Sequence, residues 1–316
     1  MHRFRAQLLV FLMLCVASRA WAQAPPWSHG MNAPAAANSY VFQVPDIDNV
    51  PDLHGDPCDA KLVLFIGGNQ FFVLPRLIAG FEKQHPELAG HIFYETLPPG
   101  ILRKQMEKGN AITLGNLTLR VQPDVYEAGL RVVHEMESQG KVDHAVAYAT
   151  NNLEIMVAAG NPRGILSLKD LADSNVRLSM PNPETEGVAR QIEESLRKAA
   201  GDSLVKAVYE DKVKEGTSFL TQIHHRQTPM RILEGKSDAG VVWSSEVKFQ
   251  EKIGAGIAGV RIADAENVKA VYAAGMVRNA PHREAALAWL QYLRTKEAQD
   301  AYAEFGFGLP AGLAAH

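Results

Sequence analysis

The amino-acid sequence predicts an α/β protein made of two successive units, each a sheet covered by helices. Three observations predict this fold class. Short apolar runs alternate with segments of helical period over residues 61–139, two apolar runs at 143–159 interrupt this order, and the alternation then begins again. Strands separated by helical segments are typical of βαβ units with a parallel sheet. A chain of 316 residues is long enough for two such units.

The first 22 residues have the composition of a cleaved signal peptide. Two arginines precede an apolar stretch at residues 8–17, and small residues surround Trp21. The apolar stretch is too short to cross a membrane as a mature helix, whereas this order of basic, apolar and small residues is typical of secretory signals. We expect cleavage near Ala22 or Ala24 and a soluble mature protein outside the cytoplasm.

The overall composition is that of an ordinary globular protein. The formal net charge is −3 at pH 7, and 47% of the residues are hydrophobic. We expect no nucleic-acid partner, because nucleic-acid binding requires a basic surface. Cys58 is the single cysteine beyond the signal peptide, so we expect no internal disulfide in the mature chain.

Residues 23–60 are rich in proline, alanine, asparagine and aspartate and have no sustained period, which indicates a flexible leader with one short strand at 40–44. The polar residues of its second half follow no calcium-loop or zinc-site spacing: Asp46, Asp48, Asp52, His54, Asp56, Cys58 and Asp59. We interpret this part as a solvated acidic linker. The chain has no G-x-S-x-G or H-E-x-x-H pattern, and we expect neither enzymatic activity nor a metal or cofactor.

The first unit begins with an unbroken apolar run, Lys61–Ile66, which predicts a buried strand. Two glycines end this run, and apolar residues then recur at helical spacing up to Pro86. The same reasoning predicts the remaining elements of the unit, which are strands at 91–95 and 123–126 and helices at 101–108 and 130–139.

Two apolar strands on either side of residues 150–152 connect the units, and the second ends at 160–162. Beyond them, Thr228 is the expected cap of a helix that has Pro229 at its first position. The patterns predict helices at 168–171, 188–200, 229–235, from 244 onward and at 283–294, with extended segments at 176–180, 208–214, 238–243 and 268–276.

The glycine turn after the first strand is the first candidate ligand contact. A parallel strand that passes through a turn into a helix leaves backbone N–H groups unpaired beside Asn69 and Gln70, where an anion or polar ligand can bind. The turn matches none of the longer phosphate-binding patterns. An ordinary tight turn would have the same sequence, so this segment alone leaves both interpretations open.

Four segments, in this order, carry a family resemblance over Lys61 to Pro310. They are FEKQHPEL at the end of the first helix, NNLEIMVAAGNP followed by SLKDLA, RLSMPNPETEGVARQIEESL, and DAGVVWSSEV with EFGFGLP near the end. The chain resembles the type II periplasmic solute-binding proteins of ABC transporters, nearest to the molybdate and related oxyanion-binding branch.

This resemblance implies two α/β lobes, one at 61–147 plus 274–316 and the other at 150–272. Two crossing strands would act as a hinge, and the ligand would lie in a cleft between the lobes. The resemblance also implies a periplasmic protein that captures a small polar or anionic solute and delivers it to an ABC-type membrane transporter. We expect a monomer.

The resemblance places the ligand contacts in four loops and in the segment before the 229–235 helix. The loop residues are Gly68, Asn69 and Gln70; Pro99 and Gly100; Thr185, Glu186 and Gly187; and Trp243 and Ser244. The further segment contributes Arg226 and Thr228, because it faces the cleft in the family. A cationic Arg226 beside a helix start would attract a carboxylate or phosphate, and His224 and His225 would titrate with pH. A solvated basic turn is the alternative for all three.

Each loop departs from the oxyanion-binding pattern. Serine donors are missing from the first two loops, and Pro99, Glu184 and Glu186 are present instead. Proline donates no hydrogen bond and carboxylates repel a dianion, so these changes argue against a bare tetrahedral oxyanion. Trp243, with Phe71 or Phe72, favours a larger and partly apolar ligand.

A periplasmic solute-binding protein is therefore the function that the sequence favours. The alternative is a binding module without transport, which acts as a sensory or accessory protein for a periplasmic partner. A periplasmic hydrolase is a third hypothesis. A protein partner would favour the second hypothesis, and turnover of a generic ester would favour the third.

Overall fold

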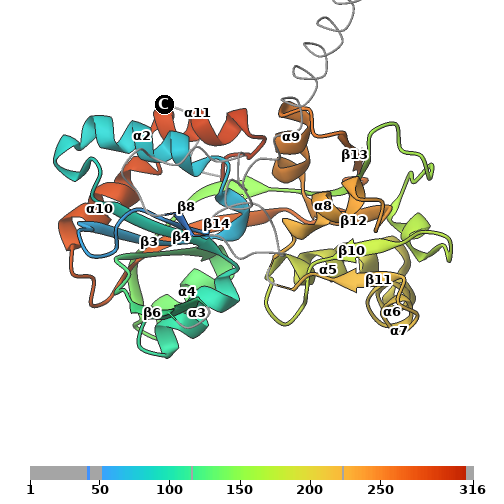
Figure 1. Ribbon diagram of the computed structural model, residues 1–316, viewed down its shortest axis with the longest axis horizontal. Helices are drawn as coiled ribbons and strands as arrows, with labels where there is room; N and C mark the ends of the chain where they lie inside the picture. The colour runs from blue at the N-terminus through green and yellow to red at the C-terminus, as the bar shows by residue number, and fades with distance from the viewer. Residues whose placement is uncertain (1–40, 43–51, 115–116, 223, 311–316) are drawn as a thin grey trace, which may run out of the picture.

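The computed structural model describes residues 41–42, 52–114, 117–222 and 224–310, and it confirms the predicted α/β fold of two lobes. Each lobe has a sheet at its centre, and the two sheets lie side by side in Figure 1. Helices cover both faces of each sheet. The predicted signal peptide and most of the predicted leader lie outside the described residues.

The first lobe contains a seven-stranded sheet in the order β1-β2-β4-β3-β7-β14-β8. Its central strands β4, β3 and β7 are parallel, and the other neighbours pair antiparallel. All six residues of β3 are buried, as expected for a parallel strand with helices on both faces. The strands are β1 (Val41–Phe42), β2 (Leu53–His54), β3 (Leu62–Gly67), β4 (Ile92–Leu97), β7 (Val125–Gly129), β8 (Val142–Asn151) and β14 (Ala270–Val277).

Helices α2, α10 and α11 lie on one side of this sheet, and α3 and α4 lie on the other (Figure 1). Helix α2 is amphipathic and buries Leu74, Leu77 and Phe81, the residues whose spacing predicted it. The elements are α2 (Leu74–Gln84), α3 (Pro99–Glu107), α4 (Leu130–Ser138), α10 (Arg283–Tyr292) and α11 (Lys296–Glu304), with 3₁₀ turns η2 (Gly68–Gln70) and η3 (Pro86–Leu88) and a hairpin of β5 (Ala111–Leu114) and β6 (Leu117–Arg120).

The second lobe contains a five-stranded sheet in the order β11-β10-β12-β9-β13. The strands are β9 (Leu153–Ala158), β10 (Leu178–Met180), β11 (Ser218–Leu220), β12 (Ala239–Trp243) and β13 (Ile257–Arg261). The helical segments are η4 (Leu168–Ala172), α5 (Val188–Ala200), α6 (Asp202–Lys206), η5 (Ala207–Asp211), α7 (Lys212–Lys214), α8 (Gln227–Leu233) and α9 (Ser244–Lys252). Helices α8 and α9 lie on one side of the sheet, and α5, α6 and α7 lie on the other (Figure 1).

The crossing between the lobes is short. Asn152 alone separates β8 from β9, and β14 returns the chain to the first sheet. The C-terminal segment is joined to this crossing, because Thr150 and Gly308 exchange two backbone hydrogen bonds of 2.8 and 2.9 Å. The predicted lobe boundaries fall close to these strands and stay a prediction.

Two predictions about local structure are wrong. The segment 208–214 is helical, in η5 and α7, because Leu204 and Val208 are buried four residues apart on one side of the chain. Thr228 is no cap, because α8 begins at Gln227 and the Thr228 hydroxyl lies 3.1 Å from that of Ser179. The sequence patterns also missed β11, β13 and α11.

The end of the predicted leader is ordered in the first sheet. Strand β2 pairs with both β1 and β4, and Leu53 is buried. Asp52 is only 2% exposed, so the expectation of a solvated acidic linker is wrong at this residue. Cys58 is exposed as a free thiol.

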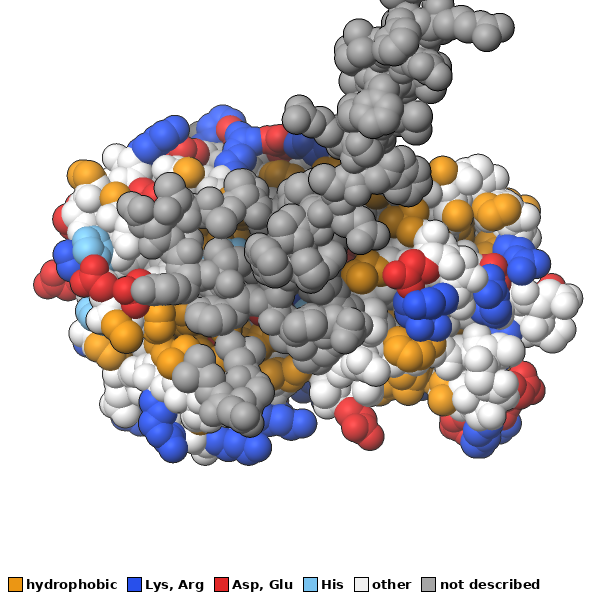
Figure 2. Space-filling model, viewed as in Figure 1, with side chains coloured by type: hydrophobic (Ala, Val, Ile, Leu, Met, Phe, Trp, Pro, Cys, Tyr) orange, Lys and Arg blue, Asp and Glu red, His pale blue; other side chains and the backbone are white. Residues whose placement is uncertain are grey.

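Within the described ranges, no helix is long and apolar enough to cross a membrane. Figure 2 shows acidic and basic side chains interspersed at the outer ends of both lobes.

Gly240→Ala should destabilise the second lobe. Gly240 lies in β12, where an added Cβ would clash with the Ser179 carbonyl oxygen and lie 2.6 Å from Thr228 Cγ2. Neither neighbour can move freely inside the sheet, so we expect a loss of about 1–3 kcal/mol in the free energy of unfolding. Urea denaturation measures it. Gly187→Ala is the matched control, because its Cβ would meet nothing within 4 Å, and an equal loss in both variants would contradict the explanation.

Candidate functional site

A cavity of about 480 Å³ lies between the lobes. Six of the twelve predicted site residues line it: Gly68, Asn69, Pro99, Glu186, Gly187 and Trp243. All four predicted loops therefore meet at this cavity through six residues. The first two loops follow neighbouring parallel strands, β3 and β4, whose carboxyl ends lie at one edge of the sheet.

The other six predicted residues do not line the cavity. Gln70 is fully buried, donates to the Tyr148 hydroxyl at 2.5 Å and accepts from the Tyr302 hydroxyl at 2.7 Å. Its side chain therefore attaches η2 to the core of the first lobe and does not contact the cavity. Ser244 donates to Asn151 at 3.0 Å. Gly100 and Thr185 lie where the lobes touch, because a Cβ on Gly100 would lie 2.8 Å from the Thr185 carbonyl oxygen. Thr228 is buried beside β10.

Asn69 is a buried polar side chain that the first lobe presents to the cavity. It is 6% exposed, and its Nδ2 donates to the Tyr272 hydroxyl at 2.7 Å. The rings of Tyr272 and Trp243 also meet at this wall, with 5.8 Å between their centroids. The preceding Gly68 leaves little space for a side chain, since a Cβ there would lie 3.1 Å from the Thr96 carbonyl oxygen.

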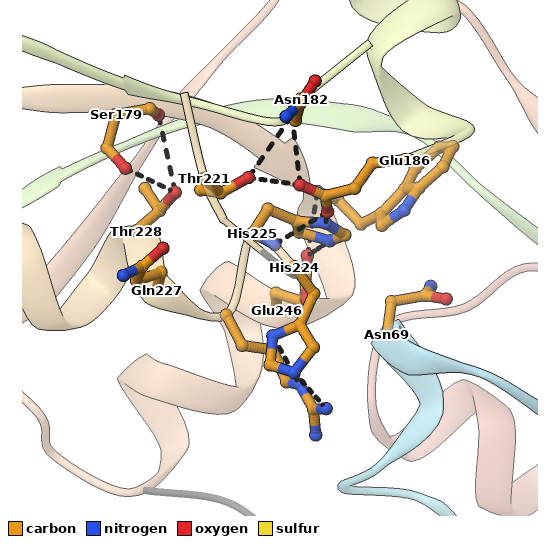
Figure 3. A network of polar contacts seen from close by, with 12 residues as sticks. Asn69, Ser179, Asn182, Glu186, Thr221, His224, His225, Gln227, Thr228 and Glu246 are labelled. Carbon is orange, nitrogen blue, oxygen red and sulfur yellow. Dashed lines mark hydrogen bonds and ion pairs between the residues drawn. The ribbon is translucent and has the colours of Figure 1, made fainter. Parts of the chain in front are cut away.

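On the side of the second lobe, a buried cluster of charged side chains, Glu186, His225 and Glu246, lies at the wall of the cavity (Figure 3). Glu186 accepts from the backbone N–H and the Nδ1 of His225, and also from the Thr221 hydroxyl and the Asn182 N–H. His225 Nε2 lies 2.8 Å from Glu246. In Figure 3, Asn69 lies across from this cluster, on the ribbon of the first lobe.

His225 is cationic at neutral pH. Burial lowers the pKa of His225, but the carboxylates of Glu246 and Glu186 raise it more, to about 10. Burial has the opposite effect on the carboxyl of Glu186 and raises its pKa. The neighbouring His225 lowers this pKa by more, so the pKa of Glu186 lies below its usual value. The charge of His225 is shared between Glu186 and Glu246, so it offsets part of the negative charge of Glu186, and Glu184 is exposed and does not line the cavity. The sequence argument that these carboxylates would repel an anion stays a prediction, and His225 weakens it for Glu186.

Arg226 joins the two lobes instead of facing the cavity. Its guanidinium bonds the Asp52 carboxylate, donates to the Thr96 carbonyl oxygen at 2.9 Å, and lies 4.8 Å from the centre of the Phe71 ring. Burial raises the pKa of Asp52, but Arg226 and His224 lower it below its usual value. The alternative of a solvated basic turn is also wrong, because His224, His225 and Arg226 are 1%, 7% and 5% exposed.

The structure adds cavity residues that sequence reasoning missed. They come from the β7–α4 turn, from the first turns of α5 and from the start of β14, and they include Gly129, Arg131, Arg190, Lys269 and Tyr272. The residues of the β7–α4 turn could have been predicted from the sequence pattern. Strand β7 is a third parallel strand that passes through a glycine into a helix, so its end lies at the same edge as those of β3 and β4.

Comparisons with known proteins identify the class. Residues 62–308 match the family model of bacterial extracellular solute-binding proteins, and the chain belongs to this family. It is a solute-binding protein of the ABC-transporter type, as the resemblance implied. The chain is 24% identical over 234 residues to the putative ABC transporter substrate-binding lipoprotein YvgL of Bacillus subtilis (strain 168). The aligned residues make up 74% of this chain and 81% of YvgL.

Two solved structures share the fold. The sulfate-binding protein SubI of Mycobacterium tuberculosis matches with a TM-score of 0.66 and 16% identity, over 79% of this chain and 87% of that chain. The periplasmic molybdate-binding protein of Azotobacter vinelandii matches with a TM-score of 0.61 and 16% identity, over 79% of this chain and 99% of that chain. At this identity, the likeness concerns the fold.

The stability of the protein should depend on pH through His225. A histidine whose pKa is raised on folding stabilises the fold fully below its unfolded pKa of about 6.5, and this stabilisation is lost as the pH rises through about 10. We expect the free energy of unfolding to fall between pH 7 and pH 10, with His225 accounting for roughly several kcal/mol of the decrease. His225→Gln should be destabilised at pH 7, and its stability should fall less over the same interval.

Urea denaturation at a series of pH values measures these free energies. His134→Gln is the control, because His134 is exposed on α4, and it should keep the wild-type dependence. A His225→Gln variant with the wild-type pH dependence would show that the buried cluster does not hold His225 in its charged form.

Proposed function

We propose that this protein captures a small anionic solute in the cavity between its lobes, in the periplasm, and presents it to an ABC-type membrane transporter. The observation that carries the proposal is the cavity itself, because loops from both lobes line it. A solute held there contacts both lobes at once, so its binding energy favours the closed arrangement. Asn69, Trp243 and the backbone amides at the helix starts are the proposed contacts.

The volume and lining of the cavity favour a solute larger than a bare oxyanion. Cavities of about 300–1,000 Å³ are typical of sites for organic ligands, and this one measures about 480 Å³. Pro98, Pro99, Trp243 and Tyr272 give it apolar surface. An organic body would cover this surface, whereas a bare tetrahedral oxyanion would leave it exposed to trapped water.

Closure of the lobes is the proposed capture step. The crossing strands β8, β9 and β14 are the proposed hinge, and contacts between the lobes already exist at Gly100 with Thr185 and at Arg226 with Asp52. Opening would have to break the buried Arg226 ion pair. The proposed cycle therefore favours the closed form, in which the solute is shielded from water.

Thermal unfolding of the mature protein with a panel of oxyanions, carboxylates and phosphorylated acids tests this function. A solute at about 100 times its Kd should stabilise the fold by ~2.7 kcal/mol, which gives a measurable rise in Tm. Asn69→Ala should weaken binding about tenfold through the loss of a hydrogen bond, and Trp243→Ala should reduce the rise as well.

Thr118→Ala is the control for these variants. Thr118 is exposed on the β5–β6 hairpin, away from the cavity lining, so the rise in Tm should equal that of the wild type. Each variant is compared with its own ligand-free Tm, which separates binding from stability. A solute that stabilises the wild type and both cavity variants equally would contradict binding in this cavity.

A further inference from the structure

Two helices, one from each lobe, begin at the cavity without the residues that usually stabilise a helix start. Helices α4 and α5 have no side-chain cap and no acidic residue in the first turn. Each instead has an arginine there: Arg131 is the second residue of α4, and Arg190 is the third residue of α5. A cation at this position is disfavoured by the helix dipole, because the unpaired N–H groups already carry partial positive charge.

The arginines line the same cavity, and Lys269, beside β14, adds a third cationic side chain. Two acidic residues occur in the lining. Glu186 shares the charge of His225 with Glu246, and Glu194 lies 3.2 Å from Lys198. On the cationic side, Arg131 lies 3.8 Å from Glu135, which does not line the cavity. Among the described residues, the lining has more cationic side chains than carboxylates, because Arg131, Arg190, Lys269 and the cationic His225 stand against Glu186 and Glu194. This excess of positive charge arises from separate elements of both lobes.

Asn69 points independently to a bound ligand. The side chain is 94% buried and lines the cavity, yet among the described residues its one hydrogen bond is the bond from Nδ2 to Tyr272. An asparagine amide has two N–H donors and an acceptor oxygen. One N–H and the oxygen of Asn69 are thus available to a polar group inside the cavity.

We propose that the solute is an organic dianion, whose two anionic groups bind at the starts of α4 and α5 beside Arg131 and Arg190. Its organic body packs on Trp243 and Tyr272. This inference rests on the proposed function and adds the charge and shape of the solute. Two anionic groups satisfy two sets of unpaired N–H groups, one in each lobe, so the dianion links the lobes and a monoanion leaves one set unpaired.

Isothermal titration calorimetry of the mature protein tests the charge of the solute. The probes are α,ω-dicarboxylates from malonate to adipate, phthalate and phosphoglycolate, each beside a matched monoanion such as butyrate or benzoate, with sulfate and molybdate included. We expect one dianion to bind at least tenfold more tightly than its matched monoanion. Arg131→Gln and Arg190→Gln should each weaken that dianion about tenfold or more, because each removes a charge-assisted hydrogen bond.

Arg197→Gln is the matched control. Arg197 lies in the last turn of α5, pairs with Asp202 at 2.6 Å and does not line the cavity, so its variant should keep the wild-type affinity. Arg190→Lys should retain part of the affinity because it keeps the charge. Circular dichroism of each variant excludes unfolding as the cause of lost binding.

The outcomes separate this inference from the proposed function. If a monoanion or a neutral solute binds most tightly and Asn69→Ala weakens it, the cavity is the site and the dianion inference is wrong. The inference is also wrong if a dianion binds equally well to the wild type and to both arginine variants. If no probe binds, including sulfate and molybdate, the dianion inference and the proposal of an anionic solute are both wrong.

Discussion

The site depends on the buried imidazolium of His225 between the carboxylates of Glu186 and Glu246. These three residues come from the loop before α5, the segment before α8 and the first turn of α9, so one ion cluster holds three parts of the second lobe together. Such a cluster contributes little net stability, because burying the charges costs about as much as their attraction returns. Removing one partner is costly, at about 3–5 kcal/mol, and this makes the geometry of the wall specific.

The next residue in the chain extends this wall to the other lobe. Arg226 bonds Asp52 and the Thr96 carbonyl oxygen, both of which belong to the first lobe. His225 also borders a second pocket of about 290 Å³, which lies between α8 and α9 and has a mostly apolar lining that includes Met230 and Phe249. The charged segment therefore separates the cavity between the lobes, which has a cationic rim, from a more apolar pocket that belongs mostly to the second lobe.

Local patterns predicted the fold because each element has its own signal. The alternation of strands and helices predicted both sheets, and the predicted helix 188–200 agrees with α5 at both ends. Segment 208–214 failed because a short helical stretch with few apolar residues has no clear period. Gly68 was predicted to be near the ligand because its turn follows a parallel strand, and Pro99 because of the family resemblance; both line the cavity.

The contacts of the site were harder to predict, because they join residues far apart in the sequence. Asp52 lies 174 residues before Arg226, and Asn69 lies 203 residues before Tyr272. Nothing local to Asp52 distinguishes it from the neighbouring aspartates. The charge of Glu186 likewise depends on His225, which is 39 residues away. Sequence reasoning could name the loops, but the partners that set their charge required the fold.

A crystal structure of the protein with the organic acid that binds it most tightly tests the central claim most directly. The account predicts that the acid lies between the lobes, with its anionic groups at the starts of α4 and α5 and within hydrogen-bond distance of Asn69. It also predicts that Arg226 stays bound to Asp52. An acid bound in the pocket between α8 and α9, or held by Arg226 in place of Asp52, would contradict the account.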